Sequence, residues 1–349
     1  MIWIGVDAHK RVHQAVAIAE VGIQGERTIS NTPAEWAALL EWARQWPERI
    51  WAVEGAWYLG RGLAQYLAEQ GERVHEVSGR LTAARRGRAV RRGKSDRLDA
   101  HAVAQLLREE AERLPRVLAL DDETAQVQLW SRTQAELTKD MTRLVNRLHD
   151  LLLLCDPQYA RGLPDLTTTA AIGALLGYHA PGEGGLARER ERIVRGTAAQ
   201  LGLLHDQDRE LRSKLERAST ARFSPLRQIE GVGPIIACAI VAELGRPRPH
   251  FAEEQLAALA AVAPLEASSA GAVRHRLNRG GNRRLNMLFH VISLTQGRIY
   301  PPARSYLERR RTEGLTAREA RRALKRHLVR RVFRAWLSSF DQHIEAVAA

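Results

Sequence analysis

Cysteine is almost absent from this chain, and so are long apolar stretches. Cys155 and Cys238 are the only cysteines in 349 residues, too few and too far apart for a disulfide framework or a thiolate zinc site. No stretch approaches the ~18 apolar residues of a membrane helix, and the N-terminus lacks the basic run and apolar core of an export signal. We therefore expect a soluble, cytoplasmic protein.

Acidic residues are scarce relative to basic ones. The chain carries 53 Lys and Arg against 40 Asp and Glu, a formal net charge of +13 and an isoelectric point of about 10.5. With 45% hydrophobic residues, a chain of this length can bury the cores of two or three domains, which excludes wholesale disorder. The basic excess favours a polyanionic partner.

The basic excess is concentrated in two segments, and the rest of the chain is net acidic. Residues 80–97 hold eight Lys and Arg against Asp96 alone, and residues 271–334 hold eighteen against three glutamates. A merely solvated face usually mixes both signs, whereas Arg309–Arg311 is an uninterrupted basic run. We predict that both segments bind nucleic-acid phosphates. The candidate contact residues are Arg85, Arg86, Arg88, Arg91, Arg92, Lys94, Arg274, Arg276, Arg279, Arg283 and Arg284.

The first hundred residues alternate between strand and helix patterns. The predicted elements are the strands Ile2–Asp7, Val12–Glu20 and Glu26–Ser30, a helix from Pro33 to about Trp46, the strand Ile50–Glu54, the helix Leu59–Gln70 and the strand Arg73–Val77. This order is that of an RNase H-like sheet. We predict an α/β N-terminal domain over residues 1–118.

The apolar period then changes to that of long helices. One helix is predicted over Asp122–Leu154 and another over about Arg188–Ala218, and the Pro and Gly residues of 157–185 are expected to break regular structure between them. Apolar positions spaced by three and four form a coiled-coil seam that includes the polar Gln134 and Asp208. Residues 119–222 are predicted to form a helical hairpin linker, whose seam packs on its own other arm or on a second subunit.

Residues 223–349 are predicted to form an all-α domain. Ile229–Pro234, followed by an apolar stretch to Leu244, is similar to the turn and second helix of a helix-hairpin-helix, whose N–H groups can hold a phosphate. A tight turn that only starts a helix explains it equally well. Asn282 is expected first of all to cap a helix. Further helices are predicted over Phe251–Val262, Gly281–Gln296, Pro302–Thr312 and Thr316–Ser338.

Acidic residues occur where predicted strands end. Asp7 and Glu54 end the first and fourth strands, and the spacing of Asp96 and Asp99 puts both on one face of a helix. Neighbouring parallel strands would bring these acids together, where they repel one another unless divalent cations lie between them. Mg²⁺ fits best, with Mn²⁺ as the alternative, and two such ions can promote phosphodiester cleavage. Taken singly, each acid is more simply a turn cap, an arginine partner or a helix N-terminal acid. Three nearby histidines are predicted to be solvated or to contact nucleic acid rather than to bind metal: His9, His13 and His101.

Several spaced motifs occur along nearly the whole chain. In order they are Ile4-Gly5-Val6-Asp7-Ala8-His9-Lys10, Val53-Glu54-Gly55-Ala56, Lys94-Ser95-Asp96-Arg97-Leu98-Asp99-Ala100, Gly231-Val232-Gly233-Pro234, Ala263-Pro264 with Ser268-Ser269, and Arg279-Gly280-Gly281-Asn282-Arg283-Arg284-Leu285-Asn286. Together they resemble the DEDD transposases, the IS one-ten family of insertion sequences. The resemblance implies a RuvC-like N-terminal domain and a C-terminal transposase domain.

The resemblance also implies a chemistry. Members of the family are DNA recombinases in which the acids matching Asp7, Glu54, Asp96 and Asp99 bind Mg²⁺. A serine of the C-terminal domain attacks the DNA and forms a covalent phosphoserine. By motif this catalytic serine is Ser269, with Ser268 as the close alternative, since this chain has Ser-Ser-Ala-Gly where the family commonly has Ser-Ser-Gly. Judged from the residues alone, both serines are ordinary loop or cap residues.

Partners follow from the same resemblance. It implies donor and target DNA, a structured guide RNA (bridge RNA) that selects them, and homodimers that assemble into a tetramer. Two other functions remain open. One is a RuvC-like two-metal nuclease, such as a junction resolvase, that uses water as the nucleophile. The other is a non-catalytic nucleic-acid-binding protein.

Overall fold

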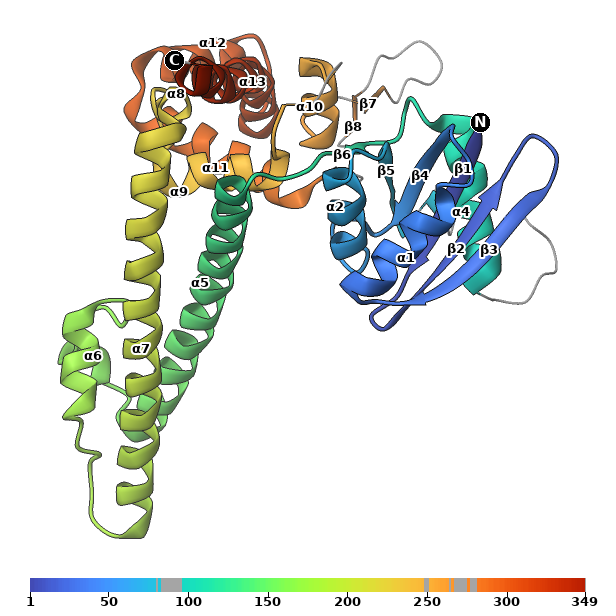
Figure 1. The fold of residues 1–349 in the computed structure, drawn as a ribbon. Coiled ribbons are helices and arrows are strands. Elements are labelled where there is room, and N and C mark those ends of the chain that lie inside the picture. The colour runs from blue at the N-terminus through green and yellow to red at the C-terminus, as the bar shows by residue number, and fades with distance from the viewer. Residues whose placement is uncertain are drawn as a thin grey trace. The chain divides into compact units, whose positions relative to one another are not determined.

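The computed structural model describes residues 1–79, 81–82, 96–247, 251–263, 265–266, 275–276 and 281–348, with backbone alone at 265–266, 275–276 and 342–348. Its two compact units are Met1–Asp121 and Asp122–Ala349 (Figure 1). No helix in the described ranges is both long and apolar enough to cross a bilayer.

The first unit is built on a six-stranded sheet with the order β3-β2-β1-β4-β5-β6. The first three strands are antiparallel, β4 and β5 run parallel to β1, and β6 is antiparallel to β5. The order of strands and helices along the chain that the sequence predicts, three strands, a helix, a strand, a helix and a strand, is therefore confirmed. The elements are β1 (Ile2–Ala8), β2 (Val12–Ile18), β3 (Ile23–Ser30), α1 (Pro33–Ala43), β4 (Arg49–Glu54), α2 (Arg61–Glu69), β5 (Val74–Val77), α4 (Asp96–Glu110) and β6 (Arg116–Val117).

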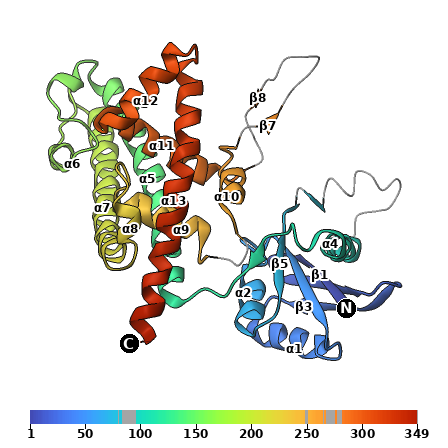
Figure 2. The same ribbon diagram turned by 90° about the horizontal axis from the view of Figure 1, so that it is seen from above.

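Helices cover both faces of this sheet, α1 and α2 on one side and α4 on the other (Figure 2). Side chains alternate between the faces along each strand. On β1, Ile4 and Val6 pack in the core with α1 and α2, so that Gly5 and Asp7 face α4. On β4, Val53 packs toward α1 and α2 while Ala52 packs in the α4 core. This alternation decides which face receives the acidic residues at the strand ends.

The second unit is helical. Its described elements are α5 (Asp122–Cys155), the short 3₁₀ helix η1 (Tyr159–Arg161), α6 (Thr169–Leu176), α7 (Gly185–Arg222), α8 (Ser224–Arg227), α9 (Pro234–Leu244), α10 (Glu253–Leu259), the two-residue strands β7 (Leu265–Glu266) and β8 (His275–Arg276), α11 (Arg283–Ile299), α12 (Pro301–Thr312) and α13 (Ala317–Ala348).

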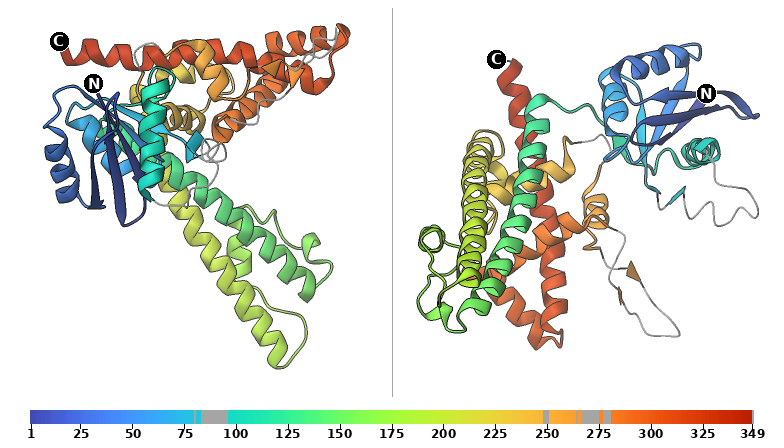
Figure 3. Two further views of the ribbon diagram at one scale, coloured as in Figure 1. Left: turned by 90° about the vertical axis from the view of Figure 1, so that its right-hand side faces the viewer. Right: turned by 90° about the horizontal axis from the view of Figure 1, so that it is seen from below.

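The long helices α5 and α7 lie side by side within this unit (Figure 3). The seam of α5 thus packs on the other arm of its own chain, one of the two possibilities that the sequence left open. Its polar member Gln134 donates a hydrogen bond from Nε2 to Oδ1 of Asp208 on α7, at 2.9 Å, with both residues buried. A buried polar pair of this kind favours one register of the two helices, because sliding them would break the hydrogen bond and leave Oδ1 of Asp208 buried against apolar side chains.

The segment between the long helices was predicted wrongly. Residues 157–185 contain α6, although their Pro and Gly content suggested no regular structure. Thr168 caps this helix by accepting a hydrogen bond from the N–H of Ala171, and Ile172 and Leu175 are buried against α7. The cap and the apolar face outweigh the helix-breaking Gly173, whose cost is only about 1 kcal/mol.

Candidate active site

The sheet brings Asp7 and Glu54 to one place. β1 and β4 are parallel neighbours whose register pairs Val6 with Val53, so the next residue on each strand is the acidic one. Asp7 and Glu54 also lie on the same face of the sheet. Asp7 is two residues after Gly5 and Glu54 is two residues after Ala52, and both of these neighbours pack toward α4. The two carboxylates at the strand ends therefore face α4.

The helix α4 supplies the other two carboxylates from its first turn, Asp96 and Asp99. Its distance from β1 is set by Gly5, where a Cβ atom would lie only 2.2 Å from the backbone nitrogen of Ala104 and 2.3 Å from the backbone oxygen of Ala100. Asp96, Ala100 and Ala104 are spaced by four and share one face of the helix. Asp96 therefore lies on the face of α4 that approaches β1 closely at Gly5.

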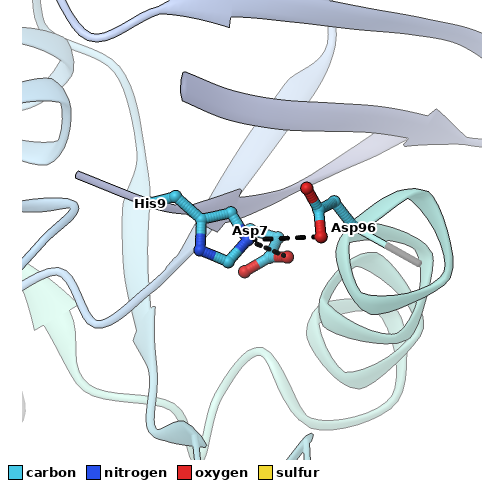
Figure 4. Close-up of side chains that lie close together, drawn as sticks. All are labelled: Asp7, His9 and Asp96. Carbon is cyan, nitrogen blue, oxygen red and sulfur yellow. Dashed lines mark ion pairs between the residues drawn. The ribbon is translucent and has the colours of Figure 1, made fainter. Parts of the chain in front are cut away.

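His9 lies between two of these carboxylates (Figure 4). Its Nε2 is 3.2 Å from Oδ2 of Asp7 and 3.4 Å from Oδ1 of Asp96. One ligand atom from each of Asp7, His9 and Asp96 lies within 4.8 Å of the other two. The structure therefore adds His9 to the acidic cluster, in a position that permits it to bind a metal ion or to neutralise the acids as a cation.

Asp7 is the most strongly perturbed member of the cluster. It is only 6% exposed, and among the described residues no group donates a hydrogen bond to its Oδ2. Burial is the main cause that raises the pKa of Asp7 from 3.8 to about 6; His9 lowers it, and repulsion from Glu54, Asp99 and Asp96 raises it further. Among the described residues, the group whose ligand atoms lie within 4.8 Å of one another is Asp7, His9 and Asp96, and Glu54 and Asp99 act on the pKa of Asp7 without belonging to that group.

Glu54 is held from the opposite side by a buried threonine. Thr82 is fully buried and donates a hydrogen bond from Oγ1 to Oε1 of Glu54, at 2.9 Å. Gly79 approaches the same oxygen so closely that a Cβ atom there would lie 2.9 Å from it. Hydrogen bonding and close packing thus restrict the carboxylate of Glu54 to one orientation.

The donor set fits a hard divalent cation. Carboxylate oxygens are the ligands that Mg²⁺ and Mn²⁺ prefer. A bound ion would offset both the burial and the repulsion that raise the pKa of Asp7. Oδ2 of Asp7 is a buried polar atom with no hydrogen-bond donor among the described residues, although His9 lies 3.2 Å from it, and a metal ion would satisfy such an atom. Asp7, Glu54, Asp96 and Asp99 therefore suit such an ion, with His9 beside them.

The second unit places some of the predicted contact residues. Arg283 is exposed at the start of α11, whereas Arg284 turns inward. The guanidinium of Arg284 donates hydrogen bonds to Oε1 of Glu243 at 3.2 Å and to the oxygens of Ser131 at 2.8 and 2.9 Å. Asn282 caps α11 as predicted, by accepting hydrogen bonds from two N–H groups of its first turn. Arg284 thus joins α11 to α9 and α5.

Other predicted residues are not placed by the structure. Of Arg276 only the backbone is described, in β8. Those outside the described residues are Arg85, Arg86, Arg88, Arg91, Arg92, Lys94, Ser268, Ser269, Arg274 and Arg279.

Comparison with known proteins decides the family. A family model for the DEDD transposases of IS110, described as "Transposase", matches residues 4–157, and the model described as "Transposase IS116/IS110/IS902 family" matches residues 224–308. The chain belongs to this family of insertion-sequence transposases. The acidic cluster lies in the part that the first model matches.

Curated relatives resemble this transposase over most of its length. The "Insertion element IS116 uncharacterized 44.8 kDa protein" of Streptomyces clavuligerus is 28% identical, covering 98% of this chain and 96% of the relative. The "Insertion element IS900 uncharacterized 42 kDa protein" of Mycobacterium paratuberculosis is 25% identical, covering 93% of each. The "Probable family 20 transposase" of Pseudomonas aeruginosa is 26% identical, covering 78% of this chain and 76% of the relative.

Among solved structures, "T. thermophilus RuvC in complex with Holliday junction substrate" aligns with 34% of the transposase and 99% of its own chain, at 17% identity and a TM-score of 0.27. "Thermus thermophilus RuvC structure" aligns with the same share at 17% identity and a TM-score of 0.28. The RNase H-like assignment rests on the strand order of the sheet and not on these alignments.

Proposed function

We propose that this transposase cuts and rejoins DNA by Mg²⁺-dependent attack of a serine, with a covalent phosphoserine intermediate. The observation that carries the proposal is the convergence of acids from β1, β4 and α4 on one face of the sheet, in a chain of a transposase family.

Each residue has a proposed task. Asp7, Glu54, Asp96 and Asp99 hold Mg²⁺ or Mn²⁺, and such ions, when bound, stabilise the negative charge that develops on phosphate oxygens. Thr82 keeps Glu54 in its ligating orientation. Ser269 supplies the hydroxyl that attacks the phosphorus, with Ser268 as the alternative nucleophile. The bond from phosphorus to one deoxyribose oxygen breaks as the serine bond forms, so the phosphodiester energy is kept for rejoining.

Partners are proposed on the family resemblance and the charge distribution. The two basic segments, residues 80–97 and 271–334, contact the phosphates of donor and target DNA and of a guide RNA. Pairing with a guide RNA would place target selection in the RNA rather than in the protein. We further propose a homodimer that assembles into a tetramer, and activity in the cytoplasm.

The test is to trap DNA on the protein. Purified transposase, the terminal DNA of its element, RNA transcribed from the element's non-coding end and Mg²⁺ are mixed, the reaction is denatured, and the modified peptide is identified by mass spectrometry. We expect an adduct on Ser269 that disappears in Ser269→Ala and, because the metal ligand is lost, also in Asp7→Asn. Ser268→Ala should retain it.

Other outcomes would select the other functions. Cleavage without an adduct, unchanged in both serine variants, would establish water as the nucleophile and a nuclease of the junction-resolving kind. If Asp7→Asn and Glu54→Gln leave every activity unchanged and no divalent ion binds, the protein is a non-catalytic nucleic-acid-binding protein.

A further inference from the structure

A cavity of about 430 Å³ lies within the second unit, among α11, α12 and α13. These helices pack on one another (Figure 2). Four arginines line the cavity: Arg298 from α11, Arg304 and Arg311 from α12, and Arg321 from α13. The volume falls within the range of about 300–1,000 Å³ that is typical of sites for small ligands.

The cavity arginines lack acidic partners. In the described part of the chain, none of the four forms an ion pair. Nε of Arg321 is buried without a hydrogen-bond partner. By contrast, Arg310 on α12 pairs with Glu313, and Arg326 on α13 pairs with Glu253. Four guanidinium groups without ion pairs, gathered in a concave site that holds one carboxylate, leave an excess of positive charge and favour a ligand that brings negative charge.

The remaining wall of the cavity is not typical of a site for free phosphate. Leu294 and Val291 of α11 are 38% and 37% exposed, and they line the cavity with Leu307 of α12. The one acidic residue of the lining is Glu308, whose carboxylate repels phosphate but accepts hydrogen bonds from exocyclic amino groups of bases. An apolar wall, one carboxylate and four guanidiniums together match a nucleotide better than a phosphate ion.

We propose that this cavity binds one unpaired nucleotide of a nucleic-acid strand. The arginines hold the flanking phosphates, and the base lies against the apolar wall with Glu308 at its edge. A base in a duplex is stacked on both sides and cannot enter such a cavity, whereas a base in a single strand or a loop can. The inference rests on the proposed function, which makes a nucleic acid the ligand, and it names a contact site that the predicted contact residues do not include.

The test is photocrosslinking of the full-length protein. Single strands of about 8 nucleotides, within the size of known single-strand sites, carry 4-thiothymidine as DNA or 4-thiouridine as RNA. Crosslinked peptides are mapped by mass spectrometry, with the matching duplex as a third probe. We expect adducts in peptides of α11 and α12 from single strands, and far fewer from the duplex. Whichever of the DNA and RNA probes labels the cavity more strongly identifies the natural strand.

Two independent variants test the cavity itself. Arg304→Ala/Arg311→Ala removes two exposed guanidiniums, and the cavity adducts should fall about tenfold, as expected for two lost charge-assisted phosphate contacts. Leu294→Glu puts a negative charge on the apolar wall and should have the same effect with every arginine present. Arg192→Ala/Arg209→Ala removes two exposed arginines from α7 and is the matched control, which should retain the adducts. Adducts elsewhere on the chain should not change in any variant.

The outcomes separate the two proposals. If no probe crosslinks anywhere, the proposed function fails. If adducts form elsewhere but never in α11 or α12, or persist there in both cavity variants, the cavity inference is overturned while the proposed function stands. Equal labelling of the cavity by duplex and single strand would overturn the unpaired nucleotide.

Discussion

The raised pKa of Asp7 predicts that burial of this carboxylate, together with repulsion from the neighbouring acids, destabilises the metal-free transposase. The pKa rises from 3.8 in an unperturbed aspartate to about 6 in the folded protein. Each difference of one in pKa corresponds to about 1.36 kcal/mol, so ionised Asp7 costs the folded state roughly 3 kcal/mol at pH 7. The folded protein binds this proton more tightly than the unfolded chain. The free energy of unfolding therefore falls as the pH rises from about 4 to 6 and stays lower above that range.

The perturbation that isolates this cost is Asp7→Asn, because asparagine cannot ionise. In EDTA at pH 7.5 we expect the variant to be more stable than the wild type by up to about 3 kcal/mol, and at pH 4 the difference should nearly vanish. Mg²⁺ at about 100 times its dissociation constant should nearly cancel this difference at pH 7.5, because binding then stabilises the wild type by about 2.7 kcal/mol. At about 1,000 times the dissociation constant the gain is about 4.1 kcal/mol, and the order should reverse. Urea unfolding at each pH, with and without Mg²⁺, measures these differences.

A control and a refuting result complete the design. Asp140→Asn removes one negative charge from an exposed ion pair on α5 and should change stability little at either pH. If Asp7→Asn is less stable than the wild type at pH 7.5 in EDTA, the ionised carboxylate stabilises the metal-free fold, and neither burial nor repulsion raises its pKa as stated. If Mg²⁺ stabilises the variant as much as the wild type, Asp7 is not a metal ligand.

Three further predictions concern the support of the site. Gly5→Ala must push α4 away from β1, so we expect the free energy of unfolding to fall by about 1–3 kcal/mol and most metal-dependent cleavage to be lost. The control Gly196→Ala lies in open space on α7 and should raise the free energy of unfolding by about 0.5–1 kcal/mol. Thermal unfolding measures both changes. Thr82→Val keeps the shape but removes the hydrogen bond to Glu54, so titration calorimetry should show weaker Mn²⁺ binding with an unchanged fold; unchanged affinity would contradict the role of Thr82. Arg284→Ala should lower the free energy of unfolding by about 2–4 kcal/mol, because Glu243 loses its charged partner. If the salt dependence of DNA binding by this variant equals that of the wild type, Arg284 does not contact phosphate.

The sheet could be predicted from the sequence because its information is local. Apolar runs of strand length, the Thr32-Pro33 start of α1 and the glycine after α2 fix where elements begin and end, and chain order then restricts the topology. The edge strand β6 was not predicted, because two residues are too few to show the alternation of apolar and polar side chains that indicates a strand. The helix α13 runs past the predicted end at Ser338, because no residue there ends it.

The candidate site could be predicted only in part. Asp7 and Glu54 follow from strand ends, and Asp96 and Asp99 from helical spacing. The position of His9 could not be foreseen, because it depends on the turn after β1 and on how α4 approaches the sheet. The role of Thr82 could not be predicted either. Its hydroxyl is far from Glu54 along the chain, and no sequence pattern distinguishes it from other threonines. A Gly two residues before an acid at a strand end was the available signal for a closely packed helix on that face.

The two acids of α4 differ in a way that bears on how the transposase responds to nucleic acid. Asp99 is 6% exposed and fixed by the helix that Gly5 admits, whereas the side chain of Asp96 is 60% exposed and contacts only His9 among the pairs of the cluster. Asp96 is also the residue that directly follows the basic segment from Arg80 to Ser95. A phosphate backbone that binds those arginines acts on the chain immediately before an exposed carboxylate, while the three other acids stay fixed by the sheet and by packing. In the proposed metal centre, Asp96 is thus the ligand whose position a bound nucleic acid would set, and metal affinity would depend on substrate binding through this one residue.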